Sequence, residues 1–519
     1  MRALLTLLLH LLLAAAAAAA TSSRGVVRSG LVNTNVIRTV DLRALPAVKE
    51  QVGVVVQNEH DSKAYKSYVV VVSAAKRDSL AHLSVRERKS GVELEVTKLG
   101  SEDDADGNGG AQLYQASFSH ALQPGEKISL NVDYVFLNTV APRPAAVGQA
   151  ENQGWEWADD VLVQSVYSTK KQKTVVRTRG DIRDFTQIAA GGGATKDKKA
   201  VTFGPFTDGD ARDEPGLGGM RAEVRFTDNA EQVEALTHRR EYFVSHWADD
   251  LNVLEHYALR NRGPGIDGDF DKVKQTVSRF MKARDNFVKL LLVKVPAAAR
   301  NLYVVDEIGN VSTSAVTGRH RPKGEQPFKV MQLKPRYPLA GGWNYTWWHG
   351  YSVPLGGYLK VDPTRRSRHM LRVPFIGAIT ASSAQSEMVP LTAFDSQNVA
   401  ISNYELRITL PEGAADIDVR TPFDVDGVSM QPTSYYFDST GRTVVVIEQR
   451  RVSPGTSNAH VLVTYSYSAG SLWQKPLVIA SVLLVVFALA SVLSRMRMGL
   501  SSTVPGPMAR MGKKSSKTE

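Results

Sequence analysis

The 519-residue chain contains no cysteine, which excludes disulfide bonds, thiol nucleophiles and thiolate metal sites. It also lacks the patterns HExxH, GxSxG and GxxxxGK[ST], which are typical of zinc peptidases, serine hydrolases and nucleotide-binding proteins. No nucleophile–base pair or metal-ligand spacing stands out elsewhere. The sequence therefore predicts no catalytic residue, no bound cofactor and no metal ion.

Charge is absent from one long stretch near the C-terminus. Pro476 to Ser494 has no charged residue, and a helix of this length just crosses a hydrocarbon core of roughly 30 Å. Trp473 and Lys475 precede the stretch, and Arg495 follows it, as expected at the two interfaces of a bilayer. We therefore predict a transmembrane helix over residues 473–494.

The N-terminus has the pattern of a secretory signal. Arg2 is followed by a run of Leu and Ala from Ala3 to Ala20, which predicts a signal peptide over 1–20 with cleavage near Thr21; an uncleaved anchor is the alternative. A cleaved signal and one later span predict a type I membrane protein, with residues 21–472 in the lumen and the tail 495–519 in the cytosol.

The formal net charge of +11 agrees with that topology. The tail holds six Lys and Arg residues against Glu519 alone, and short positive segments stay in the cytosol. The positive charge is thus a topology signal, and we predict no nucleic-acid partner. The tail is expected to be a solvated segment beside anionic lipid.

The predicted luminal part has the period of β-structure. Val36, Arg38 and Val40 alternate with their neighbours, and further short alternating runs follow up to Tyr467. We predict a mainly β protein with two luminal antiparallel β-sandwich-like domains, over 21–235 and 236–472. Val273, Val277, Phe280 and Met281 have helical spacing, which predicts a short helix covering a sheet edge.

Two patterns invite a metal-site interpretation. Residues 104–115 match much of an EF-hand loop, but Gln115 stands where a bidentate carboxylate is needed and the flanks are strand-like. An acidic hairpin loop is the better interpretation. His246 and His256 are ten residues apart, which fits no metal spacing, and we interpret them as a surface and a core histidine.

Two other features point to surface chemistry. Asn310-Val311-Ser312 and Asn344-Tyr345-Thr346 are acceptor sequences for N-glycans, so Asn310 and Asn344 are predicted glycosylation sites. An aromatic cluster within GGWNYTWWHGY either forms an interaction surface for sugars or a neighbouring subunit, or serves packing alone. Its members are Trp343, Tyr345, Trp347 and Trp348.

Several sequence blocks resemble the ribophorin I family, and they occur in the family's order over nearly the whole mature chain. The most specific is DEIGNVSTS at 306–314. The others are VSHW at 244–247, PAAA at 296–299, RYPL at 336–339 with GGW at 341–343, LPEG at 410–413, and Asp438 with Gly441-Arg442; weaker matches are YSTK at 167–170 and GPF at 204–206.

The resemblance implies a type I protein of the endoplasmic reticulum membrane, with sheet domains similar to those of M1 aminopeptidases but no zinc domain. It implies a non-catalytic subunit of the oligosaccharyltransferase complex, which transfers oligosaccharide from dolichyl diphosphate to asparagine in N-x-S/T. Expected partners are the other subunits, including the multi-spanning catalytic one, with nascent polypeptide and the translocon as further candidates. Supporting assembly is the expected role, with presentation of acceptor chains as a further one.

The chain departs from the family in its short tail, which puts a ribosome-facing role in doubt, and after His256, where residues 263–287 differ from the pattern. Two competing functions remain open at this point. One is a degenerate luminal hydrolase, against which the missing catalytic constellation counts. The other is a standalone luminal lectin or cargo receptor that uses the aromatic cluster around Trp347.

Overall fold

The computed structural model describes residues 30–99, 111–188, 193–207, 220–280, 287–318, 320, 326–382, 399–435, 438–453 and 459–495. Over these residues the chain is mainly β and ends in one long apolar helix, which confirms the predicted fold class. The predicted signal peptide, the acidic loop at 102–110 and all of the tail after Arg495 lie outside the described residues.

Residues 30–227, here called the N-terminal β region, form three sheets. The elements are β1 (Leu31–Asp41), β2 (Ala47–Asn58), β3 (Tyr65–Val72), α2 (Ala74–Arg77), β4 (Leu80–Glu87), β5 (Glu93–Leu94), β6 (Val96–Lys98), β7 (Gln112–Leu122), β8 (Lys127–Leu137), β9 (Ala141–Pro142), β10 (Ala146–Val147), β11 (Gly154–Asp160), β12 (Lys171–Arg177), β13 (Ile182–Phe185), β14 (Ala194–Asp197), β15 (Ala200–Thr207) and β16 (Arg221–Thr227). An eight-stranded sheet has the order β14-β15-β12-β1-β2-β8-β4-β5, beside the sheets β3-β7-β6 and β13-β16-β11-β9.

Residues 233–467, the C-terminal β region, lead into the final helix. The elements are β17 (Val233–Ser245), β18 (Asp250–Asn261), β19 (Gly265–Ile266), α3 (Lys272–Phe280), β20 (Leu290–Pro296), β21 (Arg300–Asp306), β22 (Ala315–Val316), β23 (Phe328–Leu333), β24 (Asn344–Pro354), η1 (Leu355–Gly357), β25 (Leu359–Val361), β26 (Arg368–Pro374), β27 (Ile379–Ser382), β28 (Val399–Thr409), β29 (Ala415–Arg420), β30 (Gly427–Thr433), β31 (Arg442–Val452), β32 (His460–Ser466) and α4 (Ala469–Arg495). A seven-stranded sheet, β21-β24-β18-β17-β28-β31-β30, packs with the sheets β22-β23-β20-β27 and β25-β26-β32-β29.

The residues that alternate in the sequence also alternate between buried and exposed positions in the strands. In β1, Val36 and Val40 are buried, whereas Ile37 between them is exposed. Most strand pairs are antiparallel, as predicted, but β1 pairs in parallel with β12, β17 with β28, and the short β10 with β19. Long connections separate the two strands of each of these parallel pairs in the chain, which is the condition that parallel pairing requires.

Each β region has its own apolar core. One cluster of buried side chains runs from Leu31 to Phe226 and the other from Val233 to Tyr467. The regions also touch: β10 pairs with β19, and Ala47 and Leu137 pack against Ala400. The predicted domain boundary at residue 235 lies just inside β17 and stays a prediction.

The helix α3 confirms the predicted helix but corrects its predicted role. Val273 and Val277 are exposed and do not pack on a sheet edge, whereas the side chain of Phe280 and all of Met281 lie outside the described residues. The helix is held at its start instead, because the Asp271 carboxylate accepts hydrogen bonds from the amides of Val273 and Lys274.

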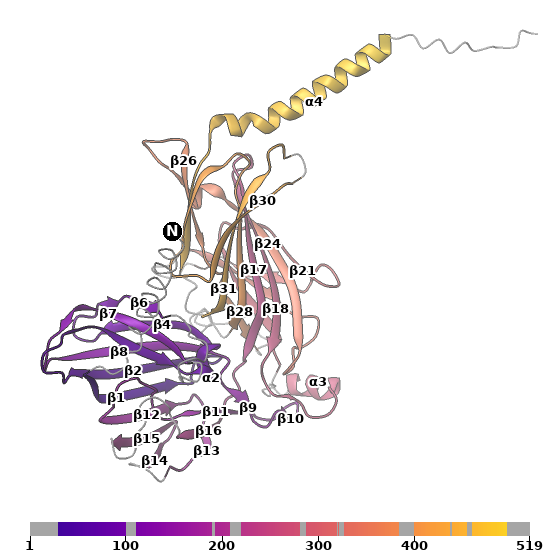
Figure 1. Ribbon diagram of the computed structural model, residues 1–519. Coiled ribbons are helices and arrows are strands. Elements are labelled where there is room, and N and C mark those ends of the chain that lie inside the picture. Colours follow the sequence, from indigo (N-terminus) through magenta and orange to yellow (C-terminus); the bar gives the residue numbers. More distant parts are fainter. Residues whose placement is uncertain are drawn as a thin grey trace, which may run out of the picture.

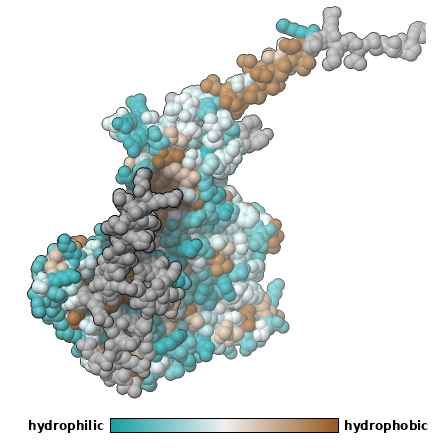
Figure 2. All heavy atoms as spheres, in the orientation of Figure 1, coloured by the Kyte–Doolittle hydropathy of each residue, from teal (hydrophilic) through white to brown (hydrophobic). Residues whose placement is uncertain are grey.

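The arrangement places the C-terminal helix at one end of the molecule. Figure 1 shows α4 leaving the end of the C-terminal β region that lies away from the N-terminal β region. This helix is long and apolar enough to cross a membrane, its apolar side chains are exposed, and it forms the brown rod in Figure 2. The C-terminal β region therefore lies next to the membrane that α4 would cross.

Candidate functional site

Three segments that are distant in sequence meet the start of α4, and we call this site the junction. They are the turn after β17, the turn after β28 and the approach to β31. The turn after β17 contributes Trp247, the turn after β28 contributes Glu412, and the approach to β31 contributes Asp438 and Ser439, and each of these side chains contacts the first two turns of the helix. The junction is thus the place where the β-structure holds the membrane helix.

An indole completes the hydrogen bonding of α4 where a proline interrupts it. Pro476 has no amide hydrogen, so the carbonyl of Leu472 lacks its donor within the helix. The indole Nε1–H of Trp247 donates to that carbonyl at 3.0 Å. The ring of Trp247 also meets Trp473 edge to face, with centroids 6.1 Å apart. Trp247 therefore fixes α4 by a polar and an aromatic contact.

A buried carboxylate organises the second part of the junction. Glu412 Oε1 accepts hydrogen bonds from the amides and hydroxyls of Ser439 and Thr440, at 2.6–3.0 Å. Burial alone would raise the pKa of Glu412, but these bonds, led by the Thr440 amide, hold it below its usual value. Gln474 of α4 in turn donates to the Ser439 hydroxyl at 2.8 Å.

A second carboxylate forms ion pairs across the junction. Asp438, whose side chain is fully buried, lies 3.1 Å from Arg442 and 2.5 Å from Lys475 of α4. Burial would raise the pKa of Asp438, but the hydrogen bonds from Lys475 and Arg442 lower it overall. Lys475, which the sequence suggested as an interface anchor, is thus also an ion-pair partner of the β-structure.

The turn of LPEG requires glycine at its end. Gly413 has a positive φ of 83°, and a β-carbon there would lie 2.8 Å from the Ser471 hydroxyl of α4. The turn can approach the helix this closely only without a side chain.

Removing the indole donor should loosen the start of α4. For Trp247→Phe we expect a loss of about 1 kcal/mol, because the indole N–H donor is lost while an aromatic ring is kept beside Trp473. Amide hydrogen exchange over residues 470–475 in the full chain measures it. In a Pro476→Ala background the new amide can donate to Leu472, so the same substitution should cost less; an equal cost in both backgrounds would contradict this account.

A second cluster surrounds the two predicted glycosylation sites. The buried Asp306 carboxylate accepts hydrogen bonds from the guanidinium of Arg336, the hydroxyl of Tyr345 at 3.2 Å, and the amides of Ile308 and Gly309. Its pKa is lowered, chiefly by the bond from Arg336. Asp306 thus ties the loop that carries Asn310 to the strand that carries Asn344.

Both predicted acceptor asparagines are accessible. The side chains of Asn310 and Asn344 are exposed, as are the hydroxyl residues Ser312 and Thr346 that complete the two sequons. Glycosylation itself stays a prediction.

The aromatic cluster divides between the core and the surface. Tyr345 and Trp347 are 4% and 0% exposed, because alternate residues of β24 face the apolar core, where Trp347 stacks on Tyr257 at 4.6 Å. Trp343, 37% exposed, precedes the strand, and Trp348 is half-buried beside His256. The predicted interaction surface is therefore wrong for Tyr345 and Trp347, for which packing is the correct interpretation.

Neither histidine of the sequence analysis belongs to a group of three or more possible metal ligands, and the described part of the chain contains no such group. His246 is near the junction, where its Nε2 lies 2.8 Å from the Tyr465 hydroxyl. Burial, with the nearby His369, lowers the pKa of His246 to about 4. His246 is therefore neutral at physiological pH.

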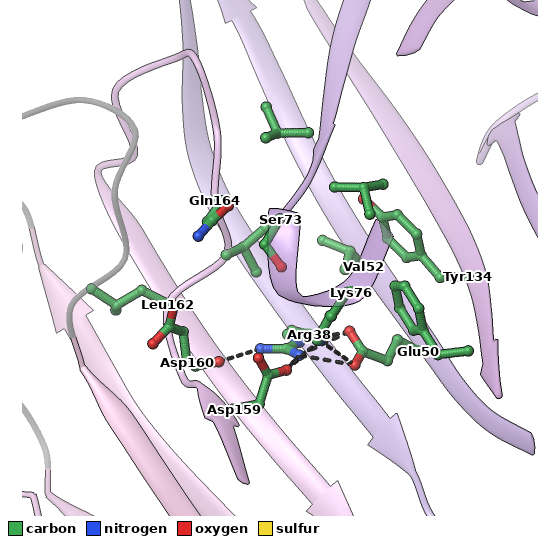
Figure 3. Close-up of a pocket in the computed structure, with 14 residues that line it drawn as sticks. Arg38, Glu50, Val52, Ser73, Lys76, Tyr134, Asp159, Asp160, Leu162 and Gln164 are labelled. Carbon is green, nitrogen blue, oxygen red and sulfur yellow. Dashed lines mark hydrogen bonds and ion pairs between the residues drawn. The ribbon is translucent and has the colours of Figure 1, made fainter. Parts of the chain in front are cut away.

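A cavity of about 50 Å³, lined by both charged and apolar side chains, lies in the N-terminal β region (Figure 3). Two cations and two carboxylates meet beside it: Arg38 and Lys76 each pair with both Glu50 and Asp159. Burial alone would raise the pKa values of both acids, but these cations hold them below the usual range. Because the four charges satisfy one another, the cluster is a structural one.

Sequence reasoning missed both the junction and this cluster. For the cluster a signal existed, since Arg38 stands at an inward position of an alternating strand. The junction depends on contacts between residues 225 positions apart, which no local pattern shows.

A sequence profile of the family described as ribophorin I matches residues 31–494 of the chain. The chain belongs to the ribophorin I family. It is 29% identical to dolichyl-diphosphooligosaccharide–protein glycosyltransferase subunit 1B of Arabidopsis thaliana, over 79% of this chain and 80% of that protein. It is 24% identical to subunit 1 of Caenorhabditis elegans, over 83% of this chain and 67% of that protein.

Solved structures give a much weaker likeness. An M1 zinc metallopeptidase of Deinococcus radiodurans is 12% identical, with a TM-score of 0.22 over 49% of this chain and 52% of that one. A score this low carries no argument about fold or function.

Five of the blocks that resemble the ribophorin I family lie at the two sites described above. VSHW supplies Trp247, LPEG supplies Glu412, and the block at 438–442 supplies Asp438 and Arg442, all at the junction. DEIGNVSTS and RYPL meet in the pair Asp306–Arg336, 30 residues apart in the chain. These five blocks, which are distant in the sequence, thus lie together at two places in the fold.

Proposed function

We propose that this chain is a non-catalytic subunit of the oligosaccharyltransferase complex in the endoplasmic reticulum membrane. Its similarity to proteins named as subunit 1 of that glycosyltransferase, along most of its length, carries the proposal. Catalysis is assigned to the multi-spanning subunit, which transfers oligosaccharide from dolichyl diphosphate to asparagine in N-x-S/T. This chain supports the assembly of the complex, and presentation of acceptor chains is a further role that we propose for its β surface.

The junction supports a mechanical role within that assembly. A β region of more than 200 residues is held to one membrane helix through a hydrogen bond, a buried acidic turn and an ion pair. A joint of this kind fixes the height and angle of the β regions above the bilayer. Subunits that share the membrane and the lumen then meet a surface of defined position.

Affinity purification of the full chain from membranes in mild detergent tests the proposal. We expect the multi-spanning catalytic subunit to co-purify, together with transfer of dolichol-linked oligosaccharide to an N-x-T peptide. The double variant Trp247→Ala/Lys475→Met should recover less of both, whereas Arg43→Met, at an exposed ion pair far from the junction, should not. A chain that purifies alone and inactive would reject the proposal and favour a lectin or cargo receptor.

Glycan occupancy tests the proposed luminal orientation. The wild-type chain should carry glycans at Asn310 and Asn344. Asn310→Gln and Asn344→Gln should therefore each lower the apparent mass on a gel by one glycan, and each should reduce the shift that glycosidase treatment causes. Ser312→Ala and Thr346→Ala should give the same shifts, because each destroys its sequon and leaves the asparagine. Asn301→Gln, outside any sequon, should change nothing. Absence of both glycans from the wild type would contradict the orientation.

A further inference from the structure

A cationic hairpin stands beside the point where the chain enters the membrane helix. Strands β25 and β26 form it, at the same end of the molecule as α4 (Figure 1). Strand β26 pairs along its length with β32, the last strand before α4. The amide of Tyr467 donates to the carbonyl of Ser367 in the hairpin turn at 2.7 Å, and α4 begins at Ala469. The hairpin turn is therefore held at the level where the helix starts.

The hairpin has a strong excess of positive charge. Residues 359–374 contain one acid, Asp362, and five exposed cations: Lys360, Arg365, Arg366, Arg368 and Arg372. Asp362 shapes the turn, because its carboxylate accepts hydrogen bonds from the Thr364 amide and hydroxyl at 2.8 and 2.6 Å. None of the five cations has an ion-pair partner among the residues that the structure describes, unlike Arg38, Arg336 or Lys475.

Apolar side chains lie between these cations. Val361 is 49% exposed and Met370 is 41% exposed, on the paired strands of the hairpin. At the same end of the molecule, the exposed rings of Trp247 and Trp473 meet at the junction. Exposed apolar groups, tryptophans and cations at one level are typical of the interface between a membrane and water. In Figure 2 the lobe beside the start of α4 is hydrophilic, next to the brown helix.

We propose that the hairpin 359–374 binds the phosphate groups of anionic lipid headgroups, in the leaflet on the side of the β regions. Guanidinium groups suit this ligand because their paired donors match two phosphate oxygens. Lipid is favoured over an acidic protein segment by position: the hairpin turn is bonded two residues before α4, so the bilayer surface lies next to it. This contact supports the junction at a second point and resists tilting of the C-terminal β region.

The absence of cysteine allows a clean test on the full chain. A fluorophore is attached through Ser367→Cys, whose native hydroxyl makes no described hydrogen bond, and the protein is placed in nanodiscs of phosphatidylcholine with increasing phosphatidylserine. Spin-labelled lipid should quench this fluorophore increasingly as the anionic fraction rises. A fluorophore attached through Ser62→Cys, exposed in the N-terminal β region, should not be quenched.

Charge reversal separates recognition from proximity. Arg365→Glu/Arg366→Glu should weaken the binding of the hairpin to membranes that contain phosphatidylserine, as measured by the quenching, by roughly fivefold for each cation removed. Each cation near an anionic surface contributes about that factor to the affinity. Arg365→Lys/Arg366→Lys should retain most of it. The matched control Arg88→Glu/Lys89→Glu, on an exposed turn of the N-terminal β region, should have no effect.

Two results would overturn the proposal. One is quenching that is equal in pure phosphatidylcholine and insensitive to charge reversal, which would mean that the hairpin is near the bilayer without binding phosphate. The other is no quenching in any nanodisc, with protection of the fluorophore appearing only in the assembled complex. That result would assign the cations to an acidic segment of a protein partner.

Discussion

Replacing Arg38 by methionine should lower the free energy of unfolding of the N-terminal β region by about 3–5 kcal/mol. The guanidinium is buried and bonds both oxygens of Glu50 at 2.9 Å, and it pairs with Asp159 as well. Methionine keeps much of the apolar volume but leaves two buried carboxylates with Lys76 as their remaining cation. The loss of stability comes from that uncompensated negative charge in the folded protein. Amide hydrogen exchange in β1 and β2 of the full chain measures it.

An exposed pair at the end of the same strand provides the control. Arg43 pairs with Asp41 at 2.6 Å, but both groups reach solvent, so Arg43→Met should cost no more than about 1 kcal/mol. A loss of that small size for Arg38→Met would show that the buried cluster contributes little.

The dependence of stability on pH follows from the lowered pKa values of Glu50 and Asp159. Acids of this kind contribute stability above their unfolded-state pKa values, near 4, and that stability is lost as the pH falls through the folded-state values. The wild type should therefore lose stability below about pH 4 more steeply than Arg38→Met. Denaturant unfolding at about pH 3 to 7, a range set by those unfolded-state pKa values, measures this difference. If the free energy of unfolding fell equally steeply with pH in the wild type and in Arg38→Met, the argument would be contradicted.

Alternation predicted most strands because burial on one face of a sheet is a local property of the sequence. The alternating run of Val36, Arg38 and Val40 forms part of β1, with those residues buried. The same rule explains the error at the aromatic cluster. Tyr345 and Trp347 are two apart, so they share a face of β24, and only the neighbouring sheets determine that this face is the core.

The candidate site was harder to predict because its chemistry is divided among distant segments. The sequence contains Pro476 and a helix that needs a donor for Leu472, but it does not show that Trp247 is that donor. Likewise Asp306 and Arg336 stand in blocks that resemble one family, and their pairing appears only in the fold. Parallel pairing of β17 with β28 is the step that brings the turns of the junction to the same end of the sheet.

Replacing Glu255 by glutamine should destabilise the C-terminal β region by about 3–5 kcal/mol. Glu255 is fully buried, accepts the Tyr257 hydroxyl at 2.7 Å and lies 3.5 Å from Arg240, whose charge it compensates. Burial would raise the pKa of Glu255, but Arg240 holds it well below its usual range, so the native group is a carboxylate. Glutamine keeps the shape and leaves Arg240 as an unpaired buried cation. Amide hydrogen exchange in β17 and β18 of the full chain measures the loss.

Removing both charges together distinguishes this explanation from simple loss of packing. In Glu255→Gln/Arg240→Met no buried charge is left alone, so the double variant should be more stable than Glu255→Gln by itself. Glu405→Gln is the matched control on the same sheet, because Glu405 is partly exposed and its partners Arg239 and Arg407 reach solvent; we expect a loss below about 1 kcal/mol. If the double variant were instead the least stable of the three, packing and hydrogen bonding around Tyr257 would outweigh charge compensation. The ion pair would then serve mainly to fix the relative position of the neighbouring strands β17 and β18. The turn that joins these two strands carries Trp247 to the junction.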